Sequence, residues 1–304
     1  MAAYHDSDWA ECYDLWVRRL FGEGPAEDIP IFEKILHDIV ASKPSDLEIS
    51  IIDVGTGSGR VLIDLRNVMH EMHGRKYQVW GTEPSAPMLD RAKRFWGEAV
   101  EKRKTLKEEH DNKQEDQIKA RWSQHGATDF AQETWEHLGR GADLVIFAAG
   151  GISHVIDDKD IKLFLEEASE VIAPDGKVVI SILRDYMPEP LDQDAKNTSL
   201  KDQDAAMLEF LSKPQRIESK DHIGRVYVKY PAVETQNGDI KTETFLLNVY
   251  DADGETLLRS SELSWDTKMF NAVKMQDMIR SSELKVAEVI EGKIQVWWVL
   301  QKSR

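Results

Sequence analysis

IIDVGTGSGRVLIDL, residues 51–65, is the stretch that decides how this chain folds. It begins with apolar residues interrupted only by Asp53, continues with glycines at 55, 57 and 59, and then repeats apolar residues at helical spacing. This pattern predicts a buried strand, a bendable loop and a helix that starts at Ser58. Glycine lets a loop approach a ligand closely, and the helix N-terminus carries partial positive charge. The stretch therefore predicts a nucleotide-like ligand.

Strand and helix patterns alternate around this loop. Apolar strand patterns cover 47–54, 77–85, 141–151 and 177–183, and helical patterns lie between them. Such alternation predicts an α/β fold, doubly wound, with a mostly parallel sheet covered on both faces. At the end of the chain, 284–302 predicts two strands joined by a tight turn, with the last strand antiparallel to its neighbour. Before the first strand, two amphipathic stretches predict N-terminal helices.

The pattern changes after about residue 187. Residues 187–206 are polar and loop-like, whereas the region from about 222 to 266 alternates apolar and polar residues, with NGD and DADG between the alternating runs. These turn signals predict hairpins, and hence a small inserted antiparallel sheet. We expect this insert to cover the acceptor pocket; a dimerisation surface is the alternative.

Composition narrows the function. The chain of 304 residues has 55 acidic and 39 basic residues, for a formal charge of −16. Such a surface repels nucleic acid and anionic membranes. The single cysteine, Cys12, excludes an internal disulfide, and the N-terminus resembles no signal peptide. We expect a cytoplasmic protein with no membrane or nucleic-acid partner and, since no residue cluster has ligand spacing, no metal.

Two acids constrain the ligand further. Glu83 ends the second strand, where a carboxylate can accept hydrogen bonds from both hydroxyls of a ribose. Asp53 lies inside an apolar strand and is costly there without a partner, such as amides across the loop or a cationic ligand. The dinucleotide fingerprint would need glycine where Arg60 stands, and the P-loop lysine is absent. The ligand inferred has an adenosine ribose, a positive centre and no pyrophosphate.

Four segments carry a family resemblance. DVGTGSG (53–59) resembles the first motif of the class I S-adenosylmethionine-dependent methyltransferases, and GTEPSAPMLDRAK (81–93) is similar to their second. GADLVIFAAGGISHVID (141–157) and FLEEASEVIAPDGKVVISIL (164–183) resemble the fourth motif and the segment after it. The resemblance covers roughly residues 45–185 and the closing helix and hairpin. It implies a seven-stranded Rossmann-like methyltransferase fold, S-adenosyl-L-methionine as cofactor, and a small-molecule acceptor of natural-product type.

The resemblance also implies a cofactor site. The three glycines would line the methionine part, Asp53 would support the loop, Glu83 would bind the ribose and Met88 would flank the adenine. In WSQHGATDF (122–130) the acid that the family often places near the adenine amino group is missing, so backbone groups or a neighbour would serve. The expected cofactor-binding residues are Asp53, Gly55, Thr56, Gly57, Gly59, Glu83, Pro84, Met88, Gly126, Ala127, Ala148 and Tyr13.

Methyl transfer from a sulfonium is an in-line displacement, for which alignment alone can lower the barrier by ~7–11 kcal/mol. His154, after the fourth strand, is the candidate general base; the alternative is that it packs against the next helix. Ser153, Trp16 and His5 are the candidate substrate-binding residues. Tyr13 and Trp16 could face a sulfonium through cation–π attraction, although aromatic residues at helical spacing are more often core.

The sequence thus predicts a methyltransferase acting at O or N of a small-molecule acceptor, as a monomer or homodimer. Its expected segments are an N-terminal helical lid (1–44), a cofactor-binding core (45–186), the substrate-covering insert (187–268) and a final helix and hairpin (269–304). An NAD(P)-dependent oxidoreductase is one alternative, disfavoured by the displaced third glycine. A non-catalytic S-adenosylmethionine-binding regulatory protein is the other.

Overall fold

The computed structural model describes residues 3–21, 26–72, 74–106, 117–187, 209 and 212–303. The chain divides into two compact units, each built from two separated stretches. The accessory unit comprises Met1–Gly24 and Met187–Ala272, and the core unit comprises Pro25–Tyr186 and Val273–Arg304. The polar loop predicted at 187–206 lies outside the described residues except for Met187. The predicted division into four segments stays a prediction.

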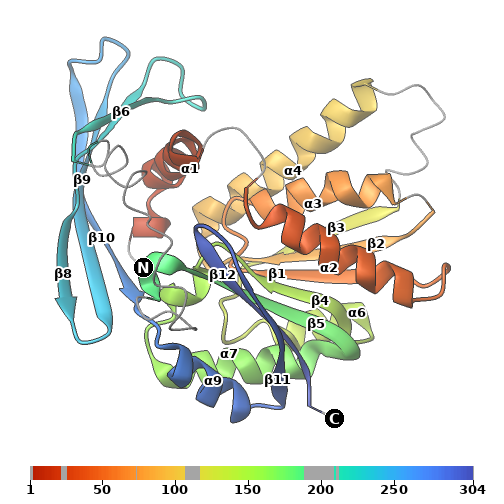
Figure 1. Ribbon diagram of the computed structural model, residues 1–304. Coiled ribbons are helices and arrows are strands. Elements are labelled where there is room, and N and C mark those ends of the chain that lie inside the picture. The colour runs from red at the N-terminus through yellow and green to blue at the C-terminus, as the bar shows by residue number, and fades with distance from the viewer. Residues whose placement is uncertain are drawn as a thin grey trace. The chain divides into compact units, whose positions relative to one another are not determined.

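A seven-stranded sheet forms the centre of the core unit (Figure 1). Of its seven strands, six run in the same direction, and the last strand of the closing hairpin is antiparallel to both of its neighbours. This confirms the predicted doubly wound, mostly parallel sheet. In spatial order the strands are β11 (Leu284–Glu291), β12 (Gln295–Lys302), β5 (Ile172–Leu183), β4 (Ala142–Phe147), β1 (Ile49–Val54), β2 (Tyr77–Thr82) and β3 (Ile118–Ser123).

Burial follows position in this sheet. The central strands β1 and β4 are buried at every residue, and their sequences, ISIIDV and ADLVIF, are accordingly mostly apolar. Strand β3 lies at the edge, where buried residues at its two ends enclose exposed and half-buried ones. Its sequence, IKARWS, carries two basic residues among the apolar ones, and this explains why hydrophobic pattern alone did not predict it.

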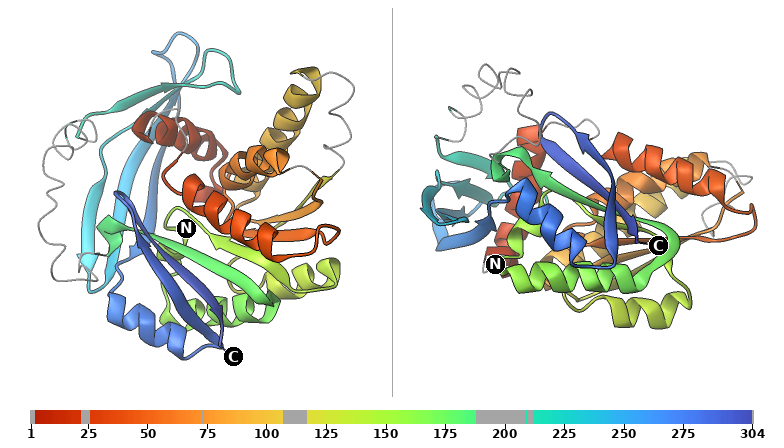
Figure 2. Two further views of the ribbon diagram at one scale, coloured as in Figure 1. Left: turned by 45° about the vertical axis from the view of Figure 1, so that its right-hand side comes forward. Right: turned by 60° about the horizontal axis from the view of Figure 1, so that its bottom comes forward.

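Helices cover both faces of the sheet (Figure 2). One face is covered by α2 (Ile29–Ser42), α3 (Arg60–Glu71) and α4 (Ala86–Leu106), and Phe32, Leu65 and Trp297 belong to the apolar cluster that they share with the strands. The opposite side carries α7 (Asp158–Val171) and α9 (Ala272–Arg280), which are linked by an ion pair between Lys274 and Asp158 (2.8 Å). The short helix α6 (Ala131–Leu138) contacts α7.

The helix after the glycine loop begins two residues later than predicted. Gly59, not Ser58, is the N-cap of α3, and its φ of +83° is left-handed. A residue in that conformation cannot belong to a right-handed helix, so the helix starts at Arg60.

The accessory unit is the predicted small antiparallel sheet together with the N-terminal helix (Figure 1). The sheet starts at Gln215, earlier than the pattern indicated, and α1 (Ser7–Phe21) follows the short helix η1 (Ala3–His5). The strands are β10 (Leu257–Lys268), β9 (Ile240–Tyr250), β7 (Val226–Lys229) and β6 (Gln215–Glu218) in order, with β8 (Val233–Asn237) also paired to β9.

One buried carboxylate ties α1 to this sheet. Glu11 accepts hydrogen bonds from Ser219 Oγ (2.9 Å), from the backbone N–H groups of Lys220 (2.7 Å) and Asp221 (2.8 Å), and from the Tyr227 hydroxyl (2.8 Å). Four donors compensate for the cost of burying the charge. The N-terminal helix and the insert, far apart in sequence, therefore form a single packed unit.

No described helix of either unit is long and apolar enough to cross a membrane.

Candidate functional site

The glycine loop lies between β1 and α3 in the core unit and has a backbone that side chains rarely allow. Gly55, Gly57 and Gly59 have φ values of +63°, +58° and +83°. A Cβ on Gly55 would come within 3.0 Å of the Phe147 ring, and one on Gly59 within 3.1 Å of Ala92. A Cβ on Gly57 would meet nothing within 4 Å. The middle of the loop therefore presents bare backbone to open space, as a bound ligand needs.

Asp53 supports this loop from beneath. Its side chain is 1% exposed and accepts a hydrogen bond from Thr56 Oγ1 at 2.6 Å. Burial raises the pKa of Asp53 to about 7, although the Thr56 hydrogen bond and the Arg60 charge both act in the opposite direction. The Thr56 N–H in turn donates to the carbonyl of Thr82 at 2.9 Å. Asp53 and Thr56 thus connect β1, the loop and the end of β2.

Glu83 reaches across from the end of β2 to the same loop. Its Oε2 accepts the Gly57 N–H at 3.0 Å, and its Oε1 accepts the Ser85 N–H at 2.9 Å. Burial raises the pKa of Glu83, and these two N–H bonds oppose the rise. A carboxylate offers about four lone-pair positions, so each oxygen keeps capacity for one more donor. Glu83 is thereby fixed beside the bare backbone and still able to bind a diol.

An ion pair holds the end of the glycine loop where α3 begins. The sequence alone did not predict it. Arg60, at the position of the missing glycine, holds Asp28 with two hydrogen bonds of 3.0 and 2.6 Å. Asp28 is fully buried and is the N-cap residue of α2, yet its side chain makes no capping bond. The pair therefore fixes the start of α2 against the start of α3.

The loops after β2 and β3 meet beside this site. Met88 is 2% exposed in the first turn of α4, and its N–H donates to Ser85 Oγ at 3.3 Å. Pro84 is half-buried, and its carbonyl accepts a hydrogen bond from Gln124 Nε2 at 3.3 Å. The residues expected to flank ribose and adenine therefore lie in linked segments.

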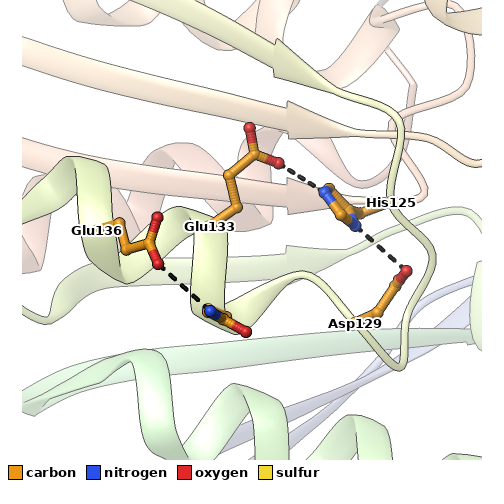
Figure 3. Close-up of a pocket in the computed structure, with 5 residues that line it drawn as sticks. His125, Asp129, Glu133 and Glu136 are labelled. Atoms are coloured by element: carbon orange, nitrogen blue, oxygen red, sulfur yellow. Dashed lines mark hydrogen bonds and ion pairs between the residues drawn. The ribbon is translucent and has the colours of Figure 1, made fainter.

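One of the residues expected to contact adenine, Gly126, already uses its N–H group within its own loop. The Gly126 N–H donates to Asp129 Oδ1 at 2.7 Å, while His125 lies between Asp129 (3.2 Å) and Glu133 (2.6 Å) (Figure 3). The N–H of Gly126 is thus already used within the loop, which leaves Ala127, half-exposed, for a ligand. The adjoining pocket is lined by His125, Asp129, Gln132, Glu133 and Glu136.

Strained backbone follows β4. Ala148 is 8% exposed, and Ala149 has a φ of +52°, which costs a non-glycine residue about 1–2 kcal/mol. Such strain is common at functional sites. The short helix η3 (Gly151–His154) then holds Ser153, which is fully buried, and His154, which is half-buried at its last position. The Ser153 hydroxyl has no hydrogen-bond partner among the described residues.

The structure thus gathers most of the predicted cofactor residues at the carboxyl edge of the parallel strands. Tyr13, Trp16 and His5 belong instead to the accessory unit, where Tyr13 and Trp16 are half-buried and His5 is exposed. Tyr13 contacts the rings of Tyr4 (5.5 Å between centroids), Trp9 (5.7 Å) and Trp16 (6.3 Å). These contacts place it in an aromatic cluster of that unit.

Two sequence comparisons place this chain among known proteins. A family model described as a methyltransferase domain matches residues 27–227. An N-methyltransferase, FrzE of a Cladobotryum species, is 31% identical over 189 residues; the match spans 59% of this chain and only 58% of that protein.

Solved structures share the fold. DesVI of Streptomyces venezuelae superposes with a TM-score of 0.60 at 16% identity, covering 96% of this chain and 98% of that one. The S-adenosylmethionine-bound aminopentose methyltransferase CalS10 of Micromonospora echinaspora gives 0.57 at 16% identity, covering 96% and 97%.

Proposed function

Because this chain belongs to the methyltransferase-domain family and has the class I S-adenosylmethionine-dependent fold, we propose that it methylates an amine nitrogen of a small molecule. The family match covers the glycine loop, both acids and the segment after β4. The choice of nitrogen over oxygen is supported by the relative at 31% identity, which is an N-methyltransferase.

The observation that carries the cofactor assignment is the joining of Gly57 to Glu83. The Gly57 N–H binds the carboxylate at 3.0 Å, while the position where its Cβ would stand is open. Gly55, Gly57 and Gly59 would take the methionine part of S-adenosylmethionine, Glu83 the ribose hydroxyls, and Met88 and Ala127 the adenine. The bound cofactor supplies an electrophilic methyl group. The negative charge of Glu83 complements the sulfonium cation.

For the reaction to proceed, the acceptor nitrogen must be aligned with the methyl carbon and must have an unprotonated lone pair. An amine that attacks carbon must be neutral, and His154 at the end of η3 is the residue that we propose takes its proton. Alignment is the larger contribution, at ~7–11 kcal/mol. We also propose that the accessory unit, with Trp16 and His5, recognises the acceptor, in a cytoplasmic protein that acts as a monomer or homodimer.

Titration calorimetry tests the cofactor first. S-adenosylmethionine and S-adenosylhomocysteine should bind, NADH should not, and Gly57→Ala should weaken binding because its methyl group occupies the open position. Binding of NADH alone would return the glycine loop to a dinucleotide role.

Acceptor type is tested by the release of S-adenosylhomocysteine from a panel of amines and matched alcohols. We expect turnover with amines. The His154→Gln variant should lose more turnover near neutral pH, where the amine carries a proton for His154 to accept, than at high pH, where the amine is already neutral. Turnover of alcohols alone would refute the nitrogen assignment. Cofactor binding without turnover of any acceptor would favour the regulatory alternative.

A further inference from the structure

Lys229, the last residue of β7, is a buried cation. Its residue is 5% exposed, and among the described residues its Nζ has neither a hydrogen bond nor an ion pair. Nζ instead lies 4.7 Å from the ring centroid of Trp16 and 4.8 Å from that of Phe245. Burial lowers the pKa of Lys229, and the charges of Glu243 and Cys12 oppose this. Aromatic faces replace only part of the hydration that a buried ammonium loses.

Two more hydrogen-bond donors in the same cluster are unsatisfied. The indole N–H groups of Trp9 and Trp16 are buried with no acceptor among the described residues. The two rings lie 6.3 Å apart between centroids, and Trp9 also contacts Phe245 at 4.6 Å. Buried polar groups in native proteins are nearly always paired, so three unpaired donors around one aromatic cluster require an explanation.

The surrounding residues do not supply the missing acceptor. Glu243 makes an ion pair with Lys241 at 3.2 Å, and no ion pair joins it to Lys229 within the part of the chain that the structure describes. Cys12 is a buried thiol, and sulfur is a weak acceptor. The cluster therefore has an excess of donors and a positive charge.

We propose that Lys229, with the indole N–H groups of Trp9 and Trp16, forms a binding site in the accessory unit for an oxyanion carried by an apolar small molecule. A carboxylate or phenolate would accept hydrogen bonds from these donors, which have no acceptor in the part of the chain that the structure describes. The rings around Lys229 would contact the apolar body of the molecule, and the half-buried Tyr13 and Trp16 supply that surface. An uncharged analogue would leave the ammonium unpaired, and a cationic one would be repelled.

This inference rests on the proposed function in one respect: the molecule bound would be the methyl acceptor. It then narrows the acceptor class to amines that also carry an acidic oxygen.

The test uses the full chain and two probes of nearly equal shape, phenylacetate and phenylacetamide. Ligand-detected NMR titration measures both dissociation constants. We expect phenylacetate to bind about tenfold or more tightly than the amide, as a charge-assisted hydrogen bond would give. Lys229→Met should bring this ratio close to one, and Lys229→Arg should restore most of it.

Lys268→Met is the matched control, because it removes the same charge from a buried lysine of the same sheet that is paired with Asp239 at 3.2 Å. The ratio of the phenylacetamide to the phenylacetate dissociation constant in this variant should stay within twofold of the wild-type ratio. Equal binding of both probes by the wild-type protein, or an unchanged ratio in Lys229→Met, would overturn the inference. Calorimetry with S-adenosylhomocysteine on the same samples distinguishes this inference from the proposed function. Absence of S-adenosylhomocysteine binding would count against the cofactor site, whereas the phenylacetate result alone decides the role of Lys229.

Discussion

The Arg60–Asp28 ion pair allows a prediction about stability: removing the cation of a buried pair should cost more unfolding free energy when the remaining carboxylate has fewer other partners. Arg60→Gln leaves Asp28 fully buried, and among the described residues no other cation pairs with it. Removing one partner of a buried pair costs about 3–5 kcal/mol. The Arg60 side chain is 35% exposed, so water offsets part of this, and we expect a loss of about 2–3 kcal/mol in unfolding free energy.

A second pair in the core unit provides the comparison. Lys43 lies 2.6 Å from Asp143, and its side chain is only 7% exposed. Asp143, however, keeps Arg140 at 2.9 Å and the N–H of Ser50 at 2.8 Å when Lys43 is removed. Lys43→Gln should therefore cost about 1 kcal/mol, less than Arg60→Gln, even though Lys43 is the more buried cation.

Urea unfolding of both variants, followed by fluorescence and far-UV circular dichroism, measures the two losses. The order is what matters: a Lys43→Gln loss equal to or larger than that of Arg60→Gln would refute the reasoning from remaining partners. Arg60→Gln should also raise the pKa of Asp53 further, because Arg60 is one of the groups that lower it.

Three further predictions concern the loop and the accessory unit. Burial raises the pKa of Asp53 in the folded protein to about 7, above its ordinary value of 3.8, so its contribution to stability is highest below about pH 4 and declines as the pH rises to 7. Asp53→Asn should remove this decline, so the wild-type minus variant difference in unfolding free energy should change by about 3 kcal/mol between pH 4.5 and 7.5, as measured by urea unfolding. Gly59→Ala should lower the melting temperature more than Gly57→Ala, because of the two new Cβ atoms only the one at position 59 meets a neighbour. Gly57→Ala should instead weaken S-adenosylhomocysteine binding more than its effect on stability explains. Equal melting temperatures for the two variants would argue against the packing reason. Tyr227→Phe removes one of the four donors to Glu11 and should cost about 1 kcal/mol without changing cofactor affinity, a result that calorimetry can contradict.

Much of the cofactor edge was predictable because its features are local in sequence. Glycines at alternate positions after an apolar strand require a special backbone whatever surrounds them, and the three positive φ values follow from that. Glu83 was placed by a similar argument, since the tip of a second parallel strand lies beside the first loop. Its hydrogen bond to Gly57 is consistent with that placement.

Other features depend on contacts that no local pattern records. Arg60 and Asp28 are 32 residues apart, and each alone resembles an ordinary surface charge. Lys229 ends the run VYVK and shares a strand face with the buried Tyr227, but a lysine at a strand end is ordinarily exposed. The aromatic rings that cover it come from α1 and β9, far away in sequence. Gly126 appeared free to bind adenine, and only the folded loop shows that Asp129 already accepts its N–H.

The Glu11 contacts also determine when this protein can finish folding. Glu11 meets Ser219 and Tyr227, which follow it by 208 and 216 positions. At a synthesis rate of 5–20 residues per second, about 10–40 s pass before these partners emerge from the ribosome. During that time Trp9 has no sheet to pack against, and β12, whose Trp297 and Trp298 complete the large sheet, emerges last of all. The accessory unit therefore cannot close before Tyr227 emerges, and the core unit cannot close before β12 does. Until then the nascent protein keeps aromatic surface exposed, which makes it a natural client for chaperones.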